Sequence, residues 1–422
     1  MSDIDYAAEL RKMGVAARAA ARQLALLSTA ARNRALESMA DQIMAATDAI
    51  LAANAADVAK AQEKGLTKAM IDRLALTPAR VEEMAKGLRS LTGLADPVGR
   101  KDATWLRPNG LRIEKVRVPI GVIAIIYEAR PNVTADAAGL CLKAGNVVFL
   151  RGGSEAAESN RAIVEALRAG LREADVTGDA VQFVPWTDRA VFDVLLTMDK
   201  YIDLVIPRGG EGLIRRVVET STIPVIKHYK GVCHVYVHKA ANLDMALAIV
   251  ENAKCQRPAT CNACETVLID AAIAKRFAPR MAELLGKRGV ELRGDEAFRK
   301  LVPEAKAATE EDWYAEYLDL ILAVRVVPGL EAAIEHIAQY GSNHSDAIVT
   351  EDRDAAQHFV EAVDSAAVYV NASTRFTDGA QFGMGAEMGI STDRIHARGP
   401  MGVEELTSYK YVVYGSGQVR TQ

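Results

Sequence analysis

A cysteine-rich stretch, VENAKCQRPATCNACETVLI, carries the most informative chemistry in the chain. A helix-forming segment ends there in a proline-containing loop that holds Cys261, and a strand-like run follows. A thiol on such a loop can face a cleft, and the nearby cations Lys254 and Arg257 would raise its thiolate fraction. The pattern predicts nucleophilic catalysis by Cys261, although a cysteine is more often a small buried hydrophobe.

Two other thiol chemistries compete for this stretch, because Cys255, Cys261 and Cys264 lie close together and the last two form a CxxC pair. Structural zinc normally needs a second ligand pair at matching spacing, and the adjacent Cys233 and His234 offer poor geometry for a closed site. A redox dithiol would open a helix in a short βαβ context, which this pair does not do. We therefore predict no metal site and assign Cys255 and Cys264 to packing.

Two glycine-rich turns are the candidates for cofactor binding. RGGSEA follows a strand-like run that ends at Leu150, and RGGEGL follows one that ends at Ile206. Glycines between a strand and a helix let backbone amides approach phosphate. The same turns also serve simple chain reversal, so the glycines alone leave both interpretations open.

The elements that must position these residues are predicted from periodicity. From Tyr6 to about Leu91, apolar residues at helical spacing predict three or four helices, and the RPNG turn at 107–110 predicts a hairpin. Short apolar runs separated by helical stretches then predict two parallel-sheet lobes dividing near Gly231. These runs cover residues 122–126, 146–150, 180–184, 203–207, 232–237, 265–270, 318–324, 346–350 and 366–370. The tail SYKYVVYG predicts a late strand that pairs with the hairpin or with another subunit.

Composition favours a cytoplasmic enzyme acting on a small molecule. The 422 residues suit two large lobes, and a formal charge of -4 gives no field that would attract nucleic acid or an anionic membrane. No apolar run is long enough to span a bilayer, and the start, MSDIDYAAELRKMG, lacks the features of a secretory signal. An odd number of cysteines, five, suits free thiols in a reducing compartment.

The pattern RPATCNACET resembles the nucleophile loop of the aldehyde dehydrogenase superfamily, in its γ-glutamyl phosphate reductase (glutamate-5-semialdehyde dehydrogenase) branch. The resemblance extends to PIGVIAIIYEARPNVTADAAGLCLKAGNVVFLRGGSEA, to IPRGGEGLI and to VNASTRFTDGAQFGMGAEMGISTDRIHARGPMG. It implies an α/β fold with two Rossmann-like parallel-sheet lobes and a small oligomerisation β-flap.

The same resemblance implies a division of the chain into six segments. They are a helical N-terminal part of the cofactor-binding domain (1–102), a flap hairpin (103–118), a Rossmann-like NADPH-binding domain (119–230), a catalytic domain with Cys261 (231–370), a return segment lining the active site (371–403) and a C-terminal flap strand (404–422).

Roles for single residues also follow from the resemblance. Asn132 would donate to the oxyanion beside the backbone N–H of Cys261, although an Asn after Pro is commonly a turn or helix cap. Arg151 matches a basic position beside the adenosine ribose, where a guanidinium favours NADPH over NADH. Glu316 resembles the glutamate that binds the nicotinamide ribose; alternatively it is an ordinary exposed acid. The remaining cofactor-binding candidates are Gly152, Gly153, Ser154, Gly209 and Gly210.

One departure from the wider superfamily bears on the reaction. Hydrolytic members use a glutamate base near the start of the catalytic lobe, whereas IPVIKHYKGVCHVYV, from Ile223 to Val237, contains no acid. Phosphate would then take the thioester carbon in place of water. The resemblance implies that the reaction is NADPH-dependent reduction of L-glutamyl 5-phosphate to L-glutamate 5-semialdehyde in proline biosynthesis. The alternatives are a hydrolytic NAD(P)-dependent aldehyde dehydrogenase and a non-catalytic or RNA-binding relative.

Such a substrate needs cations for its phosphate and carboxylate and an acid for its amino group. The residues of the resembling motifs that fit are Glu128, Arg130, Arg257, Arg375 and Arg398. Surface ion pairing is the alternative role for each arginine. A homodimer or homotetramer is expected through the flap, and a transient contact with glutamate 5-kinase, which would supply the acyl phosphate, is left open.

Overall fold

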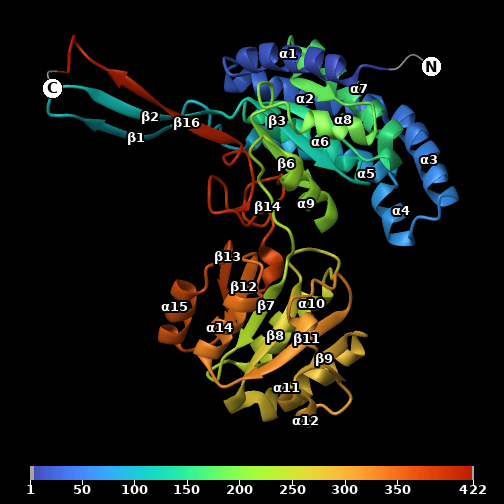
Figure 1. Cartoon of the computed structure of the whole chain (residues 1–422), viewed down its shortest axis with the longest axis vertical. Coiled ribbons are helices and arrows are strands. Elements are labelled where there is room, and N and C mark those ends of the chain that lie inside the picture. Colours follow the sequence, from blue (N-terminus) through green and yellow to red (C-terminus); the bar gives the residue numbers. More distant parts are fainter. Residues whose placement is uncertain (1–3, 421–422) are drawn as a thin grey trace. The chain divides into compact units, whose positions relative to one another are not determined.

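The computed structural model describes residues 4–420 and contains two compact units (Figure 1). Unit 1 comprises residues 4–227, 383–389 and 401–420, and unit 2 comprises residues 228–382 and 390–400. Each unit is built around its own parallel sheet, as the sequence predicts. Among the described residues, no helix combines the length and the hydropathy needed to cross a bilayer.

The N-terminal region of unit 1 contains five helices rather than the three or four expected. They are α1 (Tyr6–Leu24), α2 (Thr29–Ala45), α3 (Thr47–Glu63), α4 (Lys68–Leu74) and α5 (Pro78–Ser90). Thr67 and Thr77 explain the additional short helix, because each side chain accepts a backbone N–H three residues ahead and so starts a new helix. Pro78 fixes the first turn of α5.

The sheet of unit 1 has four parallel strands in the order β5-β4-β3-β6. The strands are β3 (Val122–Tyr127), β4 (Val147–Arg151), β5 (Val181–Phe183) and β6 (Leu204–Arg208), each within a residue or two of the expected run. The helices that follow them are α6 (Asn132–Lys143), α7 (Ala157–Glu173), α8 (Arg189–Leu195) and α9 (Glu211–Thr220). Short 3-10 turns are η1 (Leu91–Gly93), η2 (Ser154–Ala156) and η3 (Gly178–Ala180).

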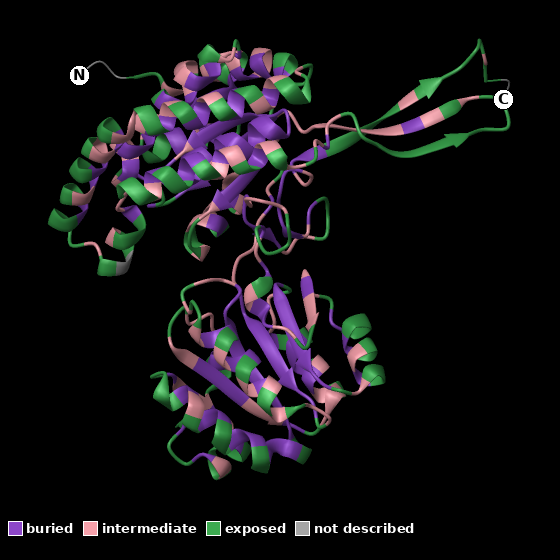
Figure 2. Ribbon diagram, turned by 180° about the vertical axis from the view of Figure 1, so that it is seen from behind, coloured by how far each residue is buried: buried purple, intermediate pink, exposed green. Residues whose placement is uncertain are grey.

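A three-stranded antiparallel sheet, the flap, projects from the helical part of unit 1 (Figure 1). It contains β1 (Lys101–Leu106), β2 (Arg112–Pro119) and β16 (Thr407–Tyr414), so the tail strand pairs with the hairpin of the same chain. All six residues of β1 are exposed, and β16 is largely exposed as well (Figure 2). The expected combination of two parallel sheets and a small antiparallel sheet is therefore confirmed.

Unit 2 has a seven-stranded parallel sheet in the order β10-β9-β11-β8-β7-β12-β13. Its strands are β7 (Cys233–Val237), β8 (Cys264–Asp270), β9 (Glu291–Gly294), β10 (Lys306–Ala307), β11 (Ile321–Val327), β12 (Ser345–Val349) and β13 (Ala367–Val370). Its helices are α10 (Leu243–Cys255), α11 (Ala271–Lys287), α12 (Glu296–Leu301), α13 (Glu310–Trp313), α14 (Leu330–Tyr340), α15 (Arg353–Ala362) and the 3-10 turn η4 (Thr374–Phe376). A small pair, β14 (Ile390–Ser391) and β15 (Gly399–Pro400), completes the unit. The short strands β9 and β10, at one end of the sheet, were not expected, because strands of only four and two residues carry little periodic signal.

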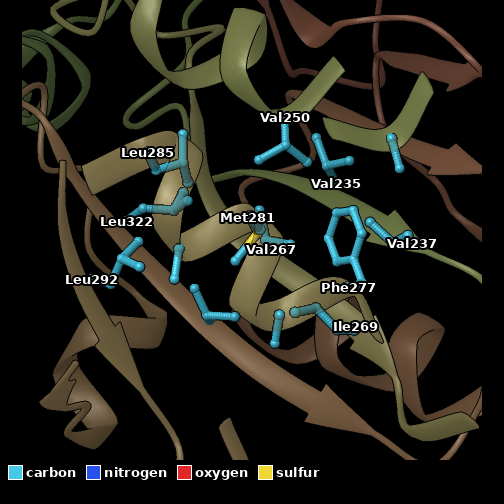
Figure 3. Close-up of a cluster of buried hydrophobic side chains, with 14 of the residues drawn as sticks. Val235, Val237, Val250, Val267, Ile269, Phe277, Met281, Leu285, Leu292 and Leu322 are labelled. Carbon is cyan, nitrogen blue, oxygen red and sulfur yellow. The ribbon is translucent and has the colours of Figure 1, made fainter. Parts of the chain in front are cut away.

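Buried apolar side chains form a hydrophobic core of unit 2 on one face of its sheet (Figure 3). Val235, Val267 and Leu322 of the strands pack against Phe277 and Met281 of α11. Because all seven strands are parallel, the loops that precede them share one edge of the sheet, the amino edge. The cysteine loop precedes β8, so it lies at this edge.

Candidate functional site

The loop between α10 and β8 places Cys261 half-buried at the amino edge of unit 2. Its neighbour Asn262 holds the loop, because the Asn262 carbonyl accepts from Thr374 Oγ1 at 2.8 Å and its Nδ2 donates to the Thr377 carbonyl at 2.8 Å. Thr377 Oγ1 in turn lies 2.6 Å from Ser345 Oγ at the start of β12. The segment after β13 therefore turns back and supports the cysteine loop.

Gly231 packs directly against the backbone of Cys261. A Cβ at Gly231 would overlap the Cys261 carbonyl, so only glycine fits this position without a shift of the loop. The Gly231 N–H donates to Glu316 Oε1 at 2.9 Å. This contact brings Glu316, the residue expected at the nicotinamide ribose, to the segment that packs on Cys261.

Two histidines lie beside Cys261. One ligand-type atom each of His228, Cys261 and His344 falls within 4.8 Å of the others, and the imidazole rings are edge-to-face with centroids 5.4 Å apart. Cys233 connects them, since its thiol donates to the Cys261 carbonyl at 3.2 Å and lies 3.7 Å from His344 Nδ1. Burial holds the pKa of His344 well below its usual value, which favours a neutral imidazole.

The other four cysteines are poor nucleophiles. All five are free thiols, but burial raises the pKa of Cys141 and Cys233, raises that of Cys264 to about 12, and raises that of Cys255 with the help of Glu251. Cys264 and Cys255 pack in or against the apolar core, in agreement with the packing role expected for them.

Lys254 does not serve the thiol as a free cation. Its ammonium lies 2.7 Å from Glu265 Oε2, and both side chains are fully buried. Burial raises the pKa of Glu265 to about 7, although the Lys254 charge opposes the shift. The other oxygen of Glu265 accepts the Leu318 N–H at 3.3 Å, just before β11. The pair therefore joins the helix before the cysteine loop to the strand after it.

The predicted substrate arginines of unit 2 divide into two groups. Arg375 bonds the cysteine loop, because it donates to Gln256 Oε1 at 2.9 Å, to Thr260 Oγ1 at 3.0 Å and to Asn262 Oδ1. Burial, followed by the charge of the exposed Arg257, lowers the pKa of Arg375.

Arg398 instead clamps Asp364. Its guanidinium donates to the side chain and the backbone carbonyl of Asp364, each at 2.6 Å, ahead of β13. Arg398 Nε is buried without a hydrogen-bond partner in the described part of the chain. These contacts give Arg398 a clear role in shaping the fold.

Asn132 is the first residue of α6 rather than its cap, since Pro131 holds the capping position. Its Nδ2 donates to Asp136 Oδ2 at 3.1 Å, one turn along the helix. Burial raises the pKa of Asp136 to about 6, against the Asn132 hydrogen bond and the Arg208 charge. The side chain of Asn132 is exposed and held by a neighbour, which is an arrangement suited to a donor that faces a ligand.

The second glycine-rich turn already binds a carboxylate. Glu128 Oε2 accepts the Gly210 N–H at 3.0 Å at the start of α9, and a Cβ at Gly209 would press on the same carboxylate. Exposed Arg130 follows Glu128 on the loop after β3. A phosphate at this turn would therefore meet the Glu128 charge.

At the first turn, Arg151 ends β4 and is half-buried. Its guanidinium lies 5.5 Å from the centre of the Phe192 ring, and Arg216 lies 5.0 Å from the same centre. One arm donates to the Thr187 carbonyl at 3.0 Å, whereas Nε is buried without a hydrogen-bond partner among residues 4–420. Burial lowers the pKa of Arg151, with the Arg216 charge adding to the shift. Gly152, Gly153 and Ser154 follow directly.

Comparison with known proteins places this geometry in a family. The model of the aldehyde dehydrogenase family matches residues 4–300. The chain is 55% identical over 417 residues to the gamma-glutamyl phosphate reductase of Moorella thermoacetica, covering 99% of this chain and 100% of that protein. The chain belongs to the aldehyde dehydrogenase family, in its γ-glutamyl phosphate reductase branch.

Other relatives of this aldehyde dehydrogenase family member agree. The gamma-glutamyl phosphate reductase of Salinibacter ruber is 55% identical over 403 residues, covering 96% of this chain and 92% of that protein. The crystal structure of the Thermotoga maritima gamma-glutamyl phosphate reductase has a TM-score of 0.96 at 49% identity, covering 98% and 100% of the two chains. An acetylating aldehyde dehydrogenase from Geobacillus thermoglucosidasius, with a TM-score of 0.71 at 18% identity over the full length of both chains, shares the fold. The family resemblance read from the sequence is thus confirmed.

Sequence reasoning missed several residues of the site. His344 belongs to no recognisable motif. The one feature of the sequence that could have indicated it is its position directly before a strand that starts at the same edge as the cysteine loop. In the sequence Gly231 indicated only the boundary between the lobes, and Asp136 and Arg216 belong to no motif that singles them out.

Proposed function

We propose that the chain reduces L-glutamyl 5-phosphate to L-glutamate 5-semialdehyde and phosphate, with NADPH as the reductant and Cys261 as the nucleophile, in proline biosynthesis. The observation that carries the proposal is the 55% identity to a curated relative of this activity along essentially the whole chain. The half-buried Cys261 loop, supported by Gly231 and Asn262, supplies the group that such a reaction needs.

The chain's own residues account for the acyl transfer. The Cys261 thiolate attacks the C5 carbonyl, the C–O bond to phosphate breaks, and a thioester forms on Sγ. The oxyanion that develops would be met by Asn132 Nδ2 and by the Cys261 N–H. A bound nicotinamide cofactor supplies the hydride that reduces the thioester, after which the C–S bond breaks and the thiol is restored.

The residues near the first glycine-rich turn fit a nicotinamide dinucleotide that carries a 2′-phosphate. Two guanidiniums, Arg151 and Arg216, flank Phe192, and the buried Arg151 Nε has an unused N–H among the described residues. Such a pair suits a dianion and favours NADPH over NADH. Gly152, Gly153 and Ser154 would bring backbone amides close to the cofactor, and Glu316, at Gly231, would hold the nicotinamide ribose.

We assign Arg375 and Arg257 to the substrate phosphate, because Arg375 donates a hydrogen bond to the cysteine loop and Arg257 is part of that loop. Glu128 and Arg130 would take the amino acid end. Arg398 would shape the site through its contact with Asp364 and would not touch the substrate itself.

The deciding experiment runs the reaction backwards. NADP⁺ reduction by L-glutamate 5-semialdehyde should require added phosphate and should be lost in Cys261→Ser. Cys255→Ser is the matched control, since Cys255 is also half-buried beside the same loop. Turnover without phosphate would favour a hydrolytic aldehyde dehydrogenase, and loss of rate in Cys255→Ser alone would move the nucleophile.

The flap supports a further part of the proposal, a homodimer or homotetramer. Trp105, Tyr409, Tyr411 and Val413 are exposed apolar or aromatic side chains on its strands. Sedimentation of Tyr411→Asp beside the unmodified protein tests this, because an unchanged mass would remove β16 from the interface.

Free thiols favour a cytoplasmic location. A transient contact with glutamate 5-kinase is tested in the coupled reaction with added hydroxylamine, which traps free acyl phosphate. If the kinase passes the acyl phosphate directly to this chain, hydroxylamine should fail to intercept it.

A further inference from the structure

The group formed by His228, Cys261 and His344 has the composition of a site for a soft divalent cation. Each residue offers one ligand-type atom, and these atoms lie within 4.8 Å of one another at the amino edge of unit 2. Two imidazoles and a thiolate are the donors that Zn²⁺ prefers, and three protein ligands leave a fourth position open. This set differs from the Cys255, Cys261 and Cys264 cluster of the sequence, since Cys264 is buried in the core.

Both histidines are held through Nδ1 by a neighbouring oxygen. His228 Nδ1 lies 2.8 Å from the Ile390 carbonyl, which only accepts, so Nδ1 carries the proton and Nε2 the lone pair of the neutral ring. His344 Nδ1 lies 2.9 Å from Ser345 Oγ. Ligating histidines are usually fixed in this way through their second nitrogen.

An independent observation points to a ligand at this place. His344 is fully buried, and its Nε2 has no hydrogen-bond partner within residues 4–420. A buried polar nitrogen without a partner costs free energy, which a bound cation would recover. The proton on Ser345 Oγ can turn toward His344 Nδ1 or Thr377, so the network tolerates either tautomer of this ring.

The three ligand atoms need to move only slightly closer together to bind a metal ion. In a tetrahedral zinc site the sulfur and nitrogen ligand atoms lie about 3.5 Å apart, from bond lengths of roughly 2.3 and 2.1 Å. Cys261 and His228 are half-buried, and rotation of their side chains can bring the atoms together while His344 stays in place.

We propose that His228, Cys261 and His344 bind a thiophilic divalent cation of the Zn²⁺ class, which withholds the Cys261 sulfur from the substrate. The thiol gives its proton to solvent when the metal–sulfur bond forms, and no redox change occurs. The inhibitory consequence rests on the proposed function, because it requires Cys261 to be the nucleophile. Metal binding itself does not.

Cobalt(II) is the direct probe, because a tetrahedral site with a thiolate ligand gives near-ultraviolet charge-transfer and visible d–d absorption. Titration of the chelator-treated full chain should saturate near one Co²⁺ per chain and be reversed by Zn²⁺. Cys261→Ser should lose the charge-transfer band, and Cys255→Ser should keep it. A band that survives in Cys261→Ser, or that Cys255→Ser abolishes, would overturn the proposal.

The histidines are tested by affinity. His228→Asn and His344→Asn should each weaken Co²⁺ binding by about tenfold or more, the size of effect seen when a ligand's support is lost. His228 is half-buried, so its variant keeps the test valid if the buried His344 variant does not fold. Unchanged affinity in His228→Asn contradicts the assignment.

Alkylation separates this proposal from the proposed function. Zn²⁺ should protect Cys261 from iodoacetamide but leave the slower alkylation of Cys255 unchanged, as measured on peptides by mass spectrometry. Equal protection of both thiols would indicate nonspecific binding and sink the site. Suppose that Cys261→Ser retained turnover while Zn²⁺ still protected Cys261 in the unmodified protein. The nucleophile assignment would then fail and the metal site would stand.

Discussion

The two units hold their candidate residues at opposite edges of their parallel sheets. In unit 1, Arg151 ends β4 and Gly209 directly follows β6, at the carboxyl ends of the strands. In unit 2, Cys261, Glu316 and His344 precede β8, β11 and β12, at the amino ends. The carboxyl edge is where open α/β sheets usually bind ligands, through glycine turns and helix N-termini. The amino edge of unit 2 works differently, because its loops are supported by side chains and by the return segment after β13.

The two edges also differ in burial, which predicts different consequences of mutation. Ser154 and Gly210 are exposed, whereas His344, Lys254 and Glu265 are fully buried. Changes at the amino edge of unit 2 should alter stability and activity together. Changes at the carboxyl edge of unit 1 should alter cofactor affinity with little loss of stability.

The largest expected effect is at the buried pair. Lys254→Met leaves the Glu265 carboxylate buried without its cation, so the free energy of unfolding should fall by about 3 to 5 kcal/mol. Urea denaturation followed by circular dichroism measures it. Lys287→Met, on the exposed surface, is the control and should change stability by less than about 0.5 kcal/mol. A similar small loss in Lys254→Met would contradict the coupling of this edge to stability.

Gly231→Ala should lower kcat by about 100-fold, because a Cβ there displaces the backbone of Cys261, the proposed nucleophile. A displacement of about 1 Å is enough for a loss of this size. Gly212→Ala is the matched control, since a Cβ at Gly212 meets nothing within 4 Å. Steady-state kinetics and the rate of Cys261 alkylation both report the change. Full activity in Gly231→Ala would show that the loop adapts.

The pH dependence of stability also tests how the buried Glu265 links the amino edge of unit 2 to stability. The pKa of Glu265 rises to about 7 in the folded chain, so between its ordinary pKa and that value the folded state binds more protons than the unfolded state. The free energy of unfolding should therefore decline as pH rises from about 5 to 8. Thermal unfolding of Glu265→Gln over this range should lack the Glu265 share of the decline. Parallel curves for the two proteins would refute this linkage.

Arg151→Ala tests the carboxyl edge of unit 1. Loss of a charge-assisted contact to the 2′-phosphate should raise the KM for NADPH by about tenfold and leave the KM for NADH nearly unchanged. The melting temperature should stay close to that of the unmodified protein. Binding of 2′,5′-ADP, measured by calorimetry, gives a readout without turnover. An equal effect on both cofactors would remove the 2′-phosphate role.

The smallest effect is expected at Asp136, which holds the side chain of Asn132, the proposed oxyanion donor. Asp136→Ala removes the acceptor that holds the Asn132 amide and should lower kcat by about threefold, the size expected for one neutral hydrogen bond. The KM for the cofactor should not change. Asp136→Asn keeps an acceptor oxygen and should restore most of the rate, whereas an equal loss in both variants would argue against positioning.

Much of unit 1 could be predicted from the sequence, because buried strands such as β3 and β4 are continuous apolar runs and their turns carry glycines. Cys261 could be proposed as the nucleophile for a similar reason, as it sits in a distinctive loop. His344 and the Gly231 contact could not be predicted, since they depend on which strands lie side by side. Strand order places β12 beside β7 although more than a hundred residues separate them. No local pattern encodes that neighbour.

The register of β16 against β2 has a consequence for biosynthesis. Thr407 to Tyr414 pair with one edge of β2, yet they are synthesised long after the β2 residues that they cover. Until then β2 presents unpaired backbone groups to other nascent chains, which is a known route to aggregation. Synthesis of β16 is therefore the step that closes this edge, and a truncation before Thr407 would leave it open for the lifetime of the protein.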